Sequence, residues 1–381
     1  MDALHCSSHQ PGPDLPGDDI LSSVGNTGIV YLRNMPVRAR MAVKLEFANP
    51  GGSLKDRSAL HIVNWAEATG RLKPGGTLIE SSSGNFGIAL AMIGAARGYK
   101  TVAVVDPKLT SANRALLEAY GAQVVTVNEP DETGSYHKPR IALANQISIE
   151  TEGSFRPDQC FNLLNGEAHY RHTGPELLRQ VGDSLAAVVC SVSTGGQLGG
   201  ISRYFRDNAP EVRVIGVDVV GSSIFGGEPK AYLTPGVGLS WTPDNLYDLG
   251  AIDRVYQVTD EGAFSSCRVL AQREGILCGP STGSTFLVAT ALAAELAPDQ
   301  VVAILGSDRG ERYLQSAYDD AWMRSHGLST STSIEDHLLR TKSVRLVSTA
   351  PEEDCANFQD GLAEKLGSPT PPQLRKIARV A

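Results

Sequence analysis

The sequence predicts an α/β fold in two units, each with a mostly parallel sheet and helices on both faces. Short apolar runs alternate with helical stretches between residues 41 and 128, and again between 186 and 305. Short connections between such runs favour parallel strands joined by right-handed crossovers. A length of 381 residues also suits two domains better than one.

The elements of the first unit follow one another closely. A strand over 41–45 leads through a Gly-rich turn into a helix over 58–69. Strands over 77–80, 101–105 and 123–128 then alternate with helices over 87–97 and 111–120, and Gly121 suits a helix stop. These elements form a β-α-β-α-β pattern, and the segment 129–153 that follows turns polar and then helical.

The second unit repeats the alternation. We expect strands over 186–192, 212–219, 255–258 and 301–305, and helices over 198–208, 260–274 and 284–296. The Gly- and Pro-rich segment 222–241 indicates a long functional loop. The predicted division is a disordered N-terminus (1–19), a large domain (20–48 and 154–325), a smaller mobile domain (49–153), and a C-terminal extension (326–381) with one or two weak helices.

Composition excludes several classes of protein. The formal charge of −8 argues against binding to nucleic acid or to an anionic membrane. No apolar run approaches the roughly 20 residues of a membrane span, and residues 1–19 lack the apolar centre of a signal peptide. The six cysteines form no CxxC pair, which fits a reducing cytosol and offers no zinc site. We therefore expect a cytoplasmic protein without a metal.

Lys55 is the candidate that organises the site. It lies in the turn Asn-Pro-Gly-Gly-Ser-Leu-Lys-Asp-Arg, residues 49–57, between a strand and a helix N-terminus. A helix N-terminus disfavours a second positive charge, so a lysine there should lose its proton more readily. A neutral amine is what forms a Schiff base. An ordinary solvated lysine after a turn is the alternative that this stretch alone leaves open.

Three small-residue turns also follow strands and open helices. The turn 81–85 can bind a carboxylate through backbone N–H groups, while Asn85 can donate a hydrogen bond to a ring oxygen. The turn from Ser193 to Gln197 can close around a phosphate, and it matches neither the dinucleotide nor the P-loop pattern. In the turn 279–284, Ser281 can hydrogen-bond a ring nitrogen or simply cap a helix.

One ligand would use all four features: an aldehyde for Lys55, a phosphate for residues 193–197, a ring nitrogen for Ser281 and a ring hydroxyl for Asn85. Pyridoxal 5′-phosphate carries these four groups. A neutral partner at the ring nitrogen moderates the electron sink, which suits elimination and replacement at a β-carbon.

The same motifs resemble the O-acetylserine sulfhydrylase and cystathionine β-synthase family, whose members use pyridoxal phosphate on the tryptophan-synthase-β fold (fold type II). The resemblance runs through roughly residues 20–325 and rests on 49–57, 83–85, 193–196, 279–283 and the run from Asn162 to Glu176. It implies that Lys55 is the Schiff-base lysine. The implied cofactor-binding residues are Lys55, Asn85, Ser193, Thr194, Gly195, Gly196, Gln197 and Ser281. The implied residues for the substrate α-carboxylate are Ser82, Ser83, Gly84, Asn85 and Gln159.

Departures from the sulfhydrylase pattern occur at 104–108, at Phe86, over 131–140 and at Arg309. They resemble the branch that joins O-phospho-L-serine to L-glutamate through an aminoacrylate, giving N-(2-amino-2-carboxyethyl)-L-glutamate for 2,3-diaminopropionate in antibiotic or siderophore biosynthesis. A phosphate leaving group and a dicarboxylate substrate require cations. Arg140 is the first candidate, followed by Lys108 and Arg309, whereas Arg57 is expected to be structural.

Three functions therefore compete. The first is the glutamate-accepting synthase. The second is a cysteine synthase that uses sulfide with O-acetyl- or O-phosphoserine, and the third is a non-catalytic relative that keeps the fold. The complete lysine turn argues against the third. The resemblance also implies a homodimer that closes over its small-molecule substrates.

Overall fold

The computed structural model describes residues 19–35, 37–132, 134–334 and 344–349. The chain divides into two compact units. Among the described residues, unit 1 holds 19–28 and 46–158, and unit 2 holds 29–45 and everything from 159 onward. Residues 49–153 lie in unit 1, but so do 20–28, 46–48 and 154–158, which the sequence assigns to the large domain.

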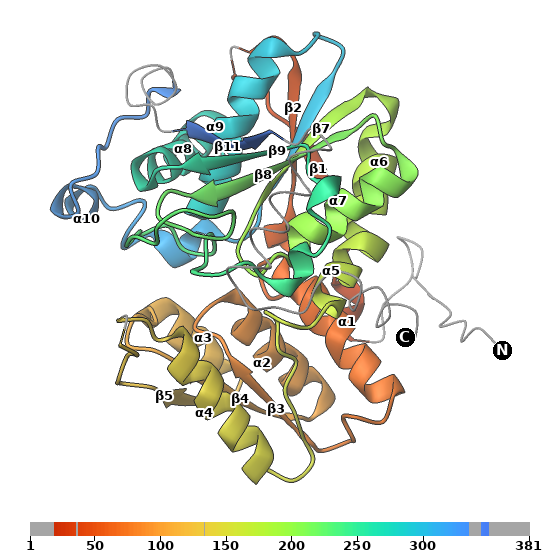
Figure 1. The fold of residues 1–381 in the computed structure, drawn as a ribbon, viewed down its shortest axis with the longest axis vertical. Coiled ribbons are helices and arrows are strands. Elements are labelled where there is room, and N and C mark those ends of the chain that lie inside the picture. Colours follow the sequence, from red (N-terminus) through yellow and green to blue (C-terminus); the bar gives the residue numbers. More distant parts are fainter. Residues whose placement is uncertain (1–18, 36, 133, 335–343, 350–381) are drawn as a thin grey trace. The chain divides into compact units, whose positions relative to one another are not determined.

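Unit 1 contains a parallel sheet with strand order β5-β4-β3-β6. Alternation along the central strand β4 decides which helix covers which face. Ala103 and Val105 pack with α2 and α3, whereas Val102 and Val104 pack with α4 (Figure 1). The elements are α1 (Lys55–Ala68), β3 (Thr77–Ser81), α2 (Asn85–Arg97), β4 (Lys100–Val105), α3 (Ser111–Ala119), β5 (Gln123–Thr126), α4 (His137–Glu150) and β6 (Ser154–Phe155).

Unit 2 contains a sheet with strand order β1-β2-β10-β7-β8-β9-β11. Its inner strands are parallel, and β1 and β11 pair antiparallel with their neighbours at the two edges. The strands are β1 (Ile29–Tyr31), β2 (Arg40–Lys44), β7 (Leu185–Ser191), β8 (Arg213–Val219), β9 (Arg254–Val258), β10 (Val301–Leu305) and β11 (Val344–Thr349).

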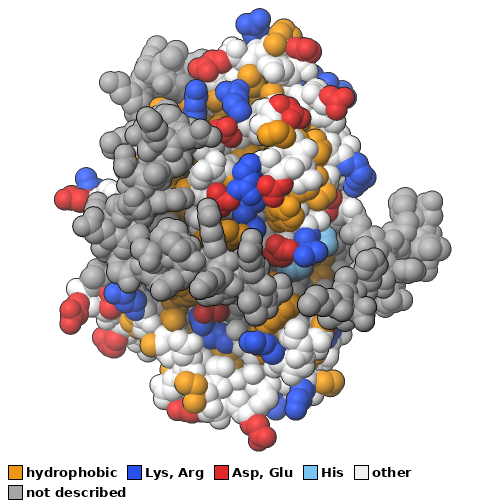
Figure 2. Space-filling view, turned by 45° about the vertical axis from the view of Figure 1, so that its right-hand side comes forward, with side chains coloured by type: hydrophobic (Ala, Val, Ile, Leu, Met, Phe, Trp, Pro, Cys, Tyr) orange, Lys and Arg blue, Asp and Glu red, His pale blue; other side chains and the backbone are white. Residues whose placement is uncertain are grey.

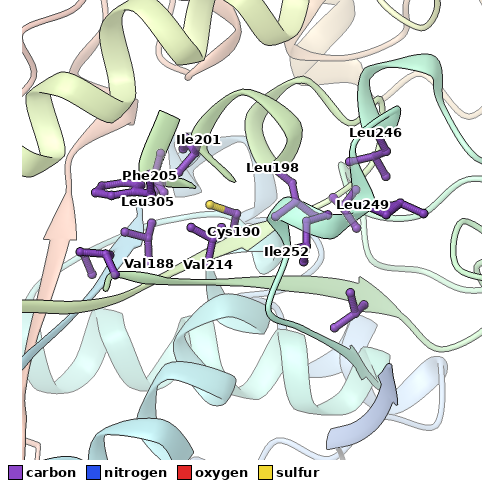
Figure 3. Close-up of a cluster of buried hydrophobic side chains, with 14 of the residues drawn as sticks. Val188, Cys190, Leu198, Ile201, Phe205, Val214, Leu246, Leu249, Ile252 and Leu305 are labelled. Atoms are coloured by element: carbon purple, nitrogen blue, oxygen red, sulfur yellow. The ribbon is translucent and has the colours of Figure 1, made fainter. Parts of the chain in front are cut away.

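The helices of unit 2 lie on both faces of this sheet, with α7 on one side and α8 and α9 on the other (Figure 1). Figure 3 shows the core under α7, where Leu198, Ile201 and Phe205 meet Val188 and Cys190 of β7. Cys190 is fully buried, which confirms the prediction that it is a core residue. The helices are α5 (Leu164–Ala168), the π-helical turn η3 (His169–Thr173), α6 (Gly174–Val181), α7 (Gly196–Asn208), α8 (Asp260–Glu274), α9 (Pro280–Glu295) and α10 (Asp320–Ser325).

Short 3-10 helices connect these elements at η1 (Ile20–Ser23), η2 (Glu46–Ala48), η4 (Gly182–Ser184), η5 (Asp244–Leu246), η6 (Leu249–Ala251) and η7 (Gly310–Tyr313). The loop 222–241 contains no helix or strand, as expected. No helix of the described residues is long and apolar enough to cross a membrane. On the face shown in Figure 2, acidic and basic side chains are interspersed over the described surface.

Two predicted helix starts are wrong by three residues or more. Helix α1 starts at Lys55 rather than at residue 58, so the lysine is its first residue. Helix α9 starts at Pro280 rather than at 284, because proline suits the first helical position. Strand β11, at the edge of the unit 2 sheet, was not predicted. The predicted disordered stretch 1–19, except Asp19, and most of 326–381 with its weak helices lie outside the described residues.

Candidate active site

The turn before Lys55 is fixed by glycine and by one carboxylate. Gly52 has a left-handed φ of 83°, which favours glycine. A Cβ on Gly51 would lie 2.5 Å from Asp56 Oδ1, so no larger residue fits there. The Gly51 N–H donates to Asp56 Oδ2 at 2.6 Å. Lys55 is half-buried at the start of α1, so the turn presents its amine from a rigid position.

A buried charged network lies beneath this turn. Arg57 donates to Glu46 from Nε at 2.6 Å and from Nη2 at 2.8 Å. The Thr27 hydroxyl and the Asn49 amide donate to the same carboxylate at 2.8 and 2.9 Å. The Arg57 and Glu46 side chains are 2% and 0% exposed. The pair ties α1 to η2, which agrees with the structural role predicted for Arg57.

The turn after β3 leads into the N-terminus of α2, where an anion can bind. The Ser82 hydroxyl oxygen accepts from the N–H of Gly87 at 3.1 Å, so its hydrogen is left to donate to a ligand. Asn85 is the first residue of α2, a helix of 13 residues that follows Gly84. Backbone N–H groups at such an end favour a carboxylate. The arrangement suits the predicted contacts of Ser82, Gly84 and Asn85 with a substrate carboxylate.

Two residues that depart from the sulfhydrylase pattern meet at Ser83. Arg140 Nη1 lies 2.7 Å from Asp106 Oδ2, and these side chains are 9% and 10% exposed. The same nitrogen donates to Ser83 Oγ at 2.7 Å, and Ser83 Oγ donates to Asp106 Oδ2 at 3.2 Å. Arg140 and Asp106 therefore hold the Ser83 hydroxyl from two sides. Lys108 is exposed, and its backbone N–H donates to Asp106 Oδ1 at 2.9 Å.

His137 completes this cluster as a neutral residue. Its Nδ1 lies 3.1 Å from Arg140 Nη2. Burial, followed by the charge of Arg140, lowers the pKa of His137 from 6.5 to about 4. Lys108 lowers this pKa further, whereas Asp106 and Asp131 oppose the shift. An uncharged imidazole next to the guanidinium leaves Arg140 as the cation at Ser83.

This shift predicts a pH effect on stability. Between pH 6.5 and 4 the folded protein binds fewer protons at His137 than the unfolded chain, so this contribution falls as the pH falls. The loss should be on the order of 1–3 kcal/mol at pH 4. Burial raises the pKa of Asp218 to about 7, so the contribution of Asp218 to stability rises as the pH falls. The test therefore compares wild type with a His137 variant, in which the contribution of Asp218 is the same. Urea unfolding of wild type and His137→Gln at pH 7 and 4.5 should give a smaller loss in the variant; equal losses would contradict the assignment.

The turn 193–197 of unit 2 fits a phosphate group. Gly195 has a left-handed φ of 80°, and α7 begins at Gly196. A Cβ on Gly196 would lie 2.2 Å from Asn165 Oδ1. The buried Gln197 Nε2 has no hydrogen-bond partner among the described residues, so an acceptor such as a phosphate oxygen would satisfy it. Ser193 donates to Gly238 O at 3.2 Å, which ties the turn to the loop 222–241.

The remaining predicted site residues of unit 2 lie in three different segments of the chain. Ser281 is buried in the first turn of α9, and Gly279, not Ser281, is the N-cap. The helix-cap alternative for Ser281 is therefore wrong. Arg309 is exposed, and its backbone bridges to Cys278, two residues before the start of α9. The carbonyl of Gln159 accepts from Asn165. Among the described residues no cluster of acidic, histidine or cysteine side chains could hold a metal.

Comparison with known proteins shows the family to which the chain belongs. A family model described as pyridoxal-phosphate dependent enzyme matches residues 20–308. The chain belongs to this family. It is thus a pyridoxal-phosphate enzyme of fold type II, in a group that catalyses β-elimination and β-replacement.

Three solved structures are similar to the chain. O-ureido-L-serine synthase shares 36% identity over 81% of this chain and 100% of that chain, with a TM-score of 0.75. The O-acetylserine dependent cystathionine β-synthase of Helicobacter pylori shares 29% over 79% and 98%, with a TM-score of 0.73. A hydrogen sulfide-producing enzyme of Fusobacterium nucleatum shares 31% over 80% and 100%, with a TM-score of 0.74.

Proposed function

We propose that this enzyme replaces the phosphate of O-phospho-L-serine with the amine of L-glutamate, releasing N-(2-amino-2-carboxyethyl)-L-glutamate. The observation that carries this proposal is the exposed Lys108 at the Ser83 turn, whose backbone N–H donates to Asp106. Sulfide would require no cation, whereas phosphate and a dicarboxylate do. In this proposal the product supplies 2,3-diaminopropionate, and the enzyme is a cytoplasmic homodimer.

In this proposal each turn has one task. Lys55, Asn85, Ser281 and residues 193–197 hold the cofactor at its aldehyde carbon, ring hydroxyl, ring nitrogen and phosphate. When bound, pyridoxal phosphate supplies the electron sink that allows the substrate α-proton to leave. Ser82, Ser83, Gly84, Asn85 and Gln159 hold the α-carboxylate.

Lys55 moves the proton. Its Nζ takes the α-proton as the Cβ–O bond breaks and phosphate leaves with the bonding electrons. The neutral glutamate amine then forms the Cβ–N bond, and Nζ returns a proton to Cα. In this proposal the exposed Lys108 and Arg309 bind the leaving phosphate and the carboxylates of glutamate. The proposed part of Arg140 is to orient Ser83, because its guanidinium already bonds that hydroxyl and Asp106.

The nucleophile decides between this function and its alternatives. A cysteine synthase would use sulfide, and the product named by the 36%-identical structure would require hydroxyurea. We would incubate the holoenzyme with O-phospho-L-serine and each nucleophile in turn and weigh the products. The glutamate adduct is expected as the main product. A sulfur-containing product alone would establish the cysteine synthase function instead, and O-acetyl-L-serine in parallel would compare the leaving groups.

A further inference from the structure

Asn165 is a fully buried side chain that no step above uses. It lies in α5 of unit 2, and its amide nitrogen makes two hydrogen bonds. Nδ2 donates to the carbonyl of Gln159 at 2.9 Å and to Thr194 Oγ1 at 3.1 Å. One amide group therefore connects the start of the segment 159–163 to the turn 193–197.

The orientation of this amide follows from chemistry. The carbonyl of Gln159 can only accept a hydrogen bond, so the atom facing it must be nitrogen and not oxygen. The second amide hydrogen then points at Thr194 Oγ1. A hydroxyl that accepts on this side donates its own hydrogen in another direction. Asn165 thus restricts the directions in which Thr194 can donate.

Close packing keeps Asn165 in this position. A Cβ on Gly196 would lie 2.2 Å from Asn165 Oδ1, and a Cβ on Gly200 would lie 2.1 Å from the carbonyl oxygen of Gly166. The backbone and side chain of 165–166 therefore touch the first two turns of α7 without any intervening side chain. A rigid support of this kind orients the donors of a binding site better than a mobile one.

We propose that Asn165 is a positioning residue for the cofactor phosphate, acting through the Thr194 hydroxyl. The inference rests on the proposed assignment of residues 193–197 to that phosphate. It assigns Asn165 no contact with the substrate or with the reacting atoms. Its effect should therefore appear in the binding of the phosphate group and not in the binding of the pyridine ring.

The test compares two probes, pyridoxal 5′-phosphate and pyridoxal, by absorbance titration of the apoenzyme. Asn165→Ala should weaken pyridoxal 5′-phosphate roughly 10- to 100-fold, as expected for losing an aligned hydrogen bond to a charged group. Pyridoxal, which lacks the phosphate, should bind about as it does to wild type. Asn208→Ala, at the exposed C-terminal end of α7, is the matched control and should change neither affinity.

Thr194→Val separates this inference from the phosphate assignment. The quantity compared is the affinity for pyridoxal 5′-phosphate divided by the affinity for pyridoxal. If residues 193–197 bind the phosphate, Thr194→Val lowers this ratio, and adding Asn165→Ala to Thr194→Val lowers it little further. A lower ratio in Thr194→Val with no change in Asn165→Ala would overturn the role of Asn165 alone. An unchanged ratio in both would overturn the phosphate assignment as well.

Asn165→Asp keeps the test decisive if the alanine variant does not fold. The carboxylate has the same shape, but it offers acceptors to the Gln159 carbonyl and to Thr194 and adds negative charge near the phosphate turn. It should weaken pyridoxal 5′-phosphate more strongly than Asn165→Ala does. Equal losses for pyridoxal and its phosphate would show a merely structural effect and would end the proposal.

Discussion

Replacing Lys55 with alanine should lower turnover of O-phospho-L-serine by about 10³-fold or more, since one amine serves as covalent anchor and as base. The visible absorption of the lysine-bound cofactor should disappear, although the cofactor can still bind through its phosphate. Lys55→Arg should fail in the same way, because a guanidinium stays protonated at all working pH values. Absorbance spectra and single-turnover rates measure both effects.

The matched control is Lys73→Ala, an exposed lysine of the same unit that lies outside every proposed contact. It should keep both the visible absorption and the rate. The thermal midpoint of the Lys55 variants shows whether they fold. It should stay close to that of wild type, because the Arg57–Glu46 network beneath the turn remains intact. A Lys55→Ala protein that keeps its visible band and its turnover would remove this lysine from the chemistry.

The position of Lys55 could be predicted from the sequence because the signal is local. An apolar strand, two glycines and a helical pattern within about twenty residues place it at a helix N-terminus, and the structure has it there. The parallel sheets were predictable for the same reason, since alternating strands and helices with short connections permit few topologies. Family membership agrees with the fold.

The contacts around Arg140 were not predictable in this way. Asp106 and Arg140 are far apart in the sequence, and each was noted separately as a departure from the sulfhydrylase pattern. Only the packing of α4 against β4 brings them to 2.7 Å. The chain around Arg140 does not show that its side chain is buried, because its partners Ser83 and Asp106 lie in distant segments. The same limit applies to Asn165, whose partners lie in other segments.

The predicted start of α9 was wrong for a different reason. The signal was present, because Gly279 and Pro280 suit the N-cap and first helical positions. Reading residues 279–284 as a turn gave more weight to the small residues than to the proline. Strand β11 also carries a signal, the short apolar run Val-Arg-Leu-Val over 344–347, but that run was assigned to the extension with its weak helices.

Removing Arg140 should cost about 3–5 kcal/mol of stability, because Asp106 would remain buried without its cation. Arg114→Ala is the control in the same unit: its pair with Glu118 is 3.6 Å long and largely exposed, and such pairs contribute little. The double variant Asp106→Ala/Arg140→Ala should recover part of the loss, since it removes the unpaired charge. Thermal and urea unfolding of wild type, Asp106→Ala, Arg140→Ala and the double variant give the coupling between the two residues.

The same variants decide how Arg140 acts on the substrate. If it orients Ser83, Arg140→Ala should raise the KM for O-phospho-L-serine and also slow the first half-reaction, because the hydroxyl loses one of its three hydrogen bonds. Arg140→Lys keeps the charge but cannot present two nitrogens in the same plane, so it should rescue only part of the loss. Suppose instead that Arg140→Ala is as stable as Arg114→Ala and that only the KM for glutamate rises. Arg140 would then bind the second substrate directly, and the ion pair with Asp106 would have no part in placing Ser83.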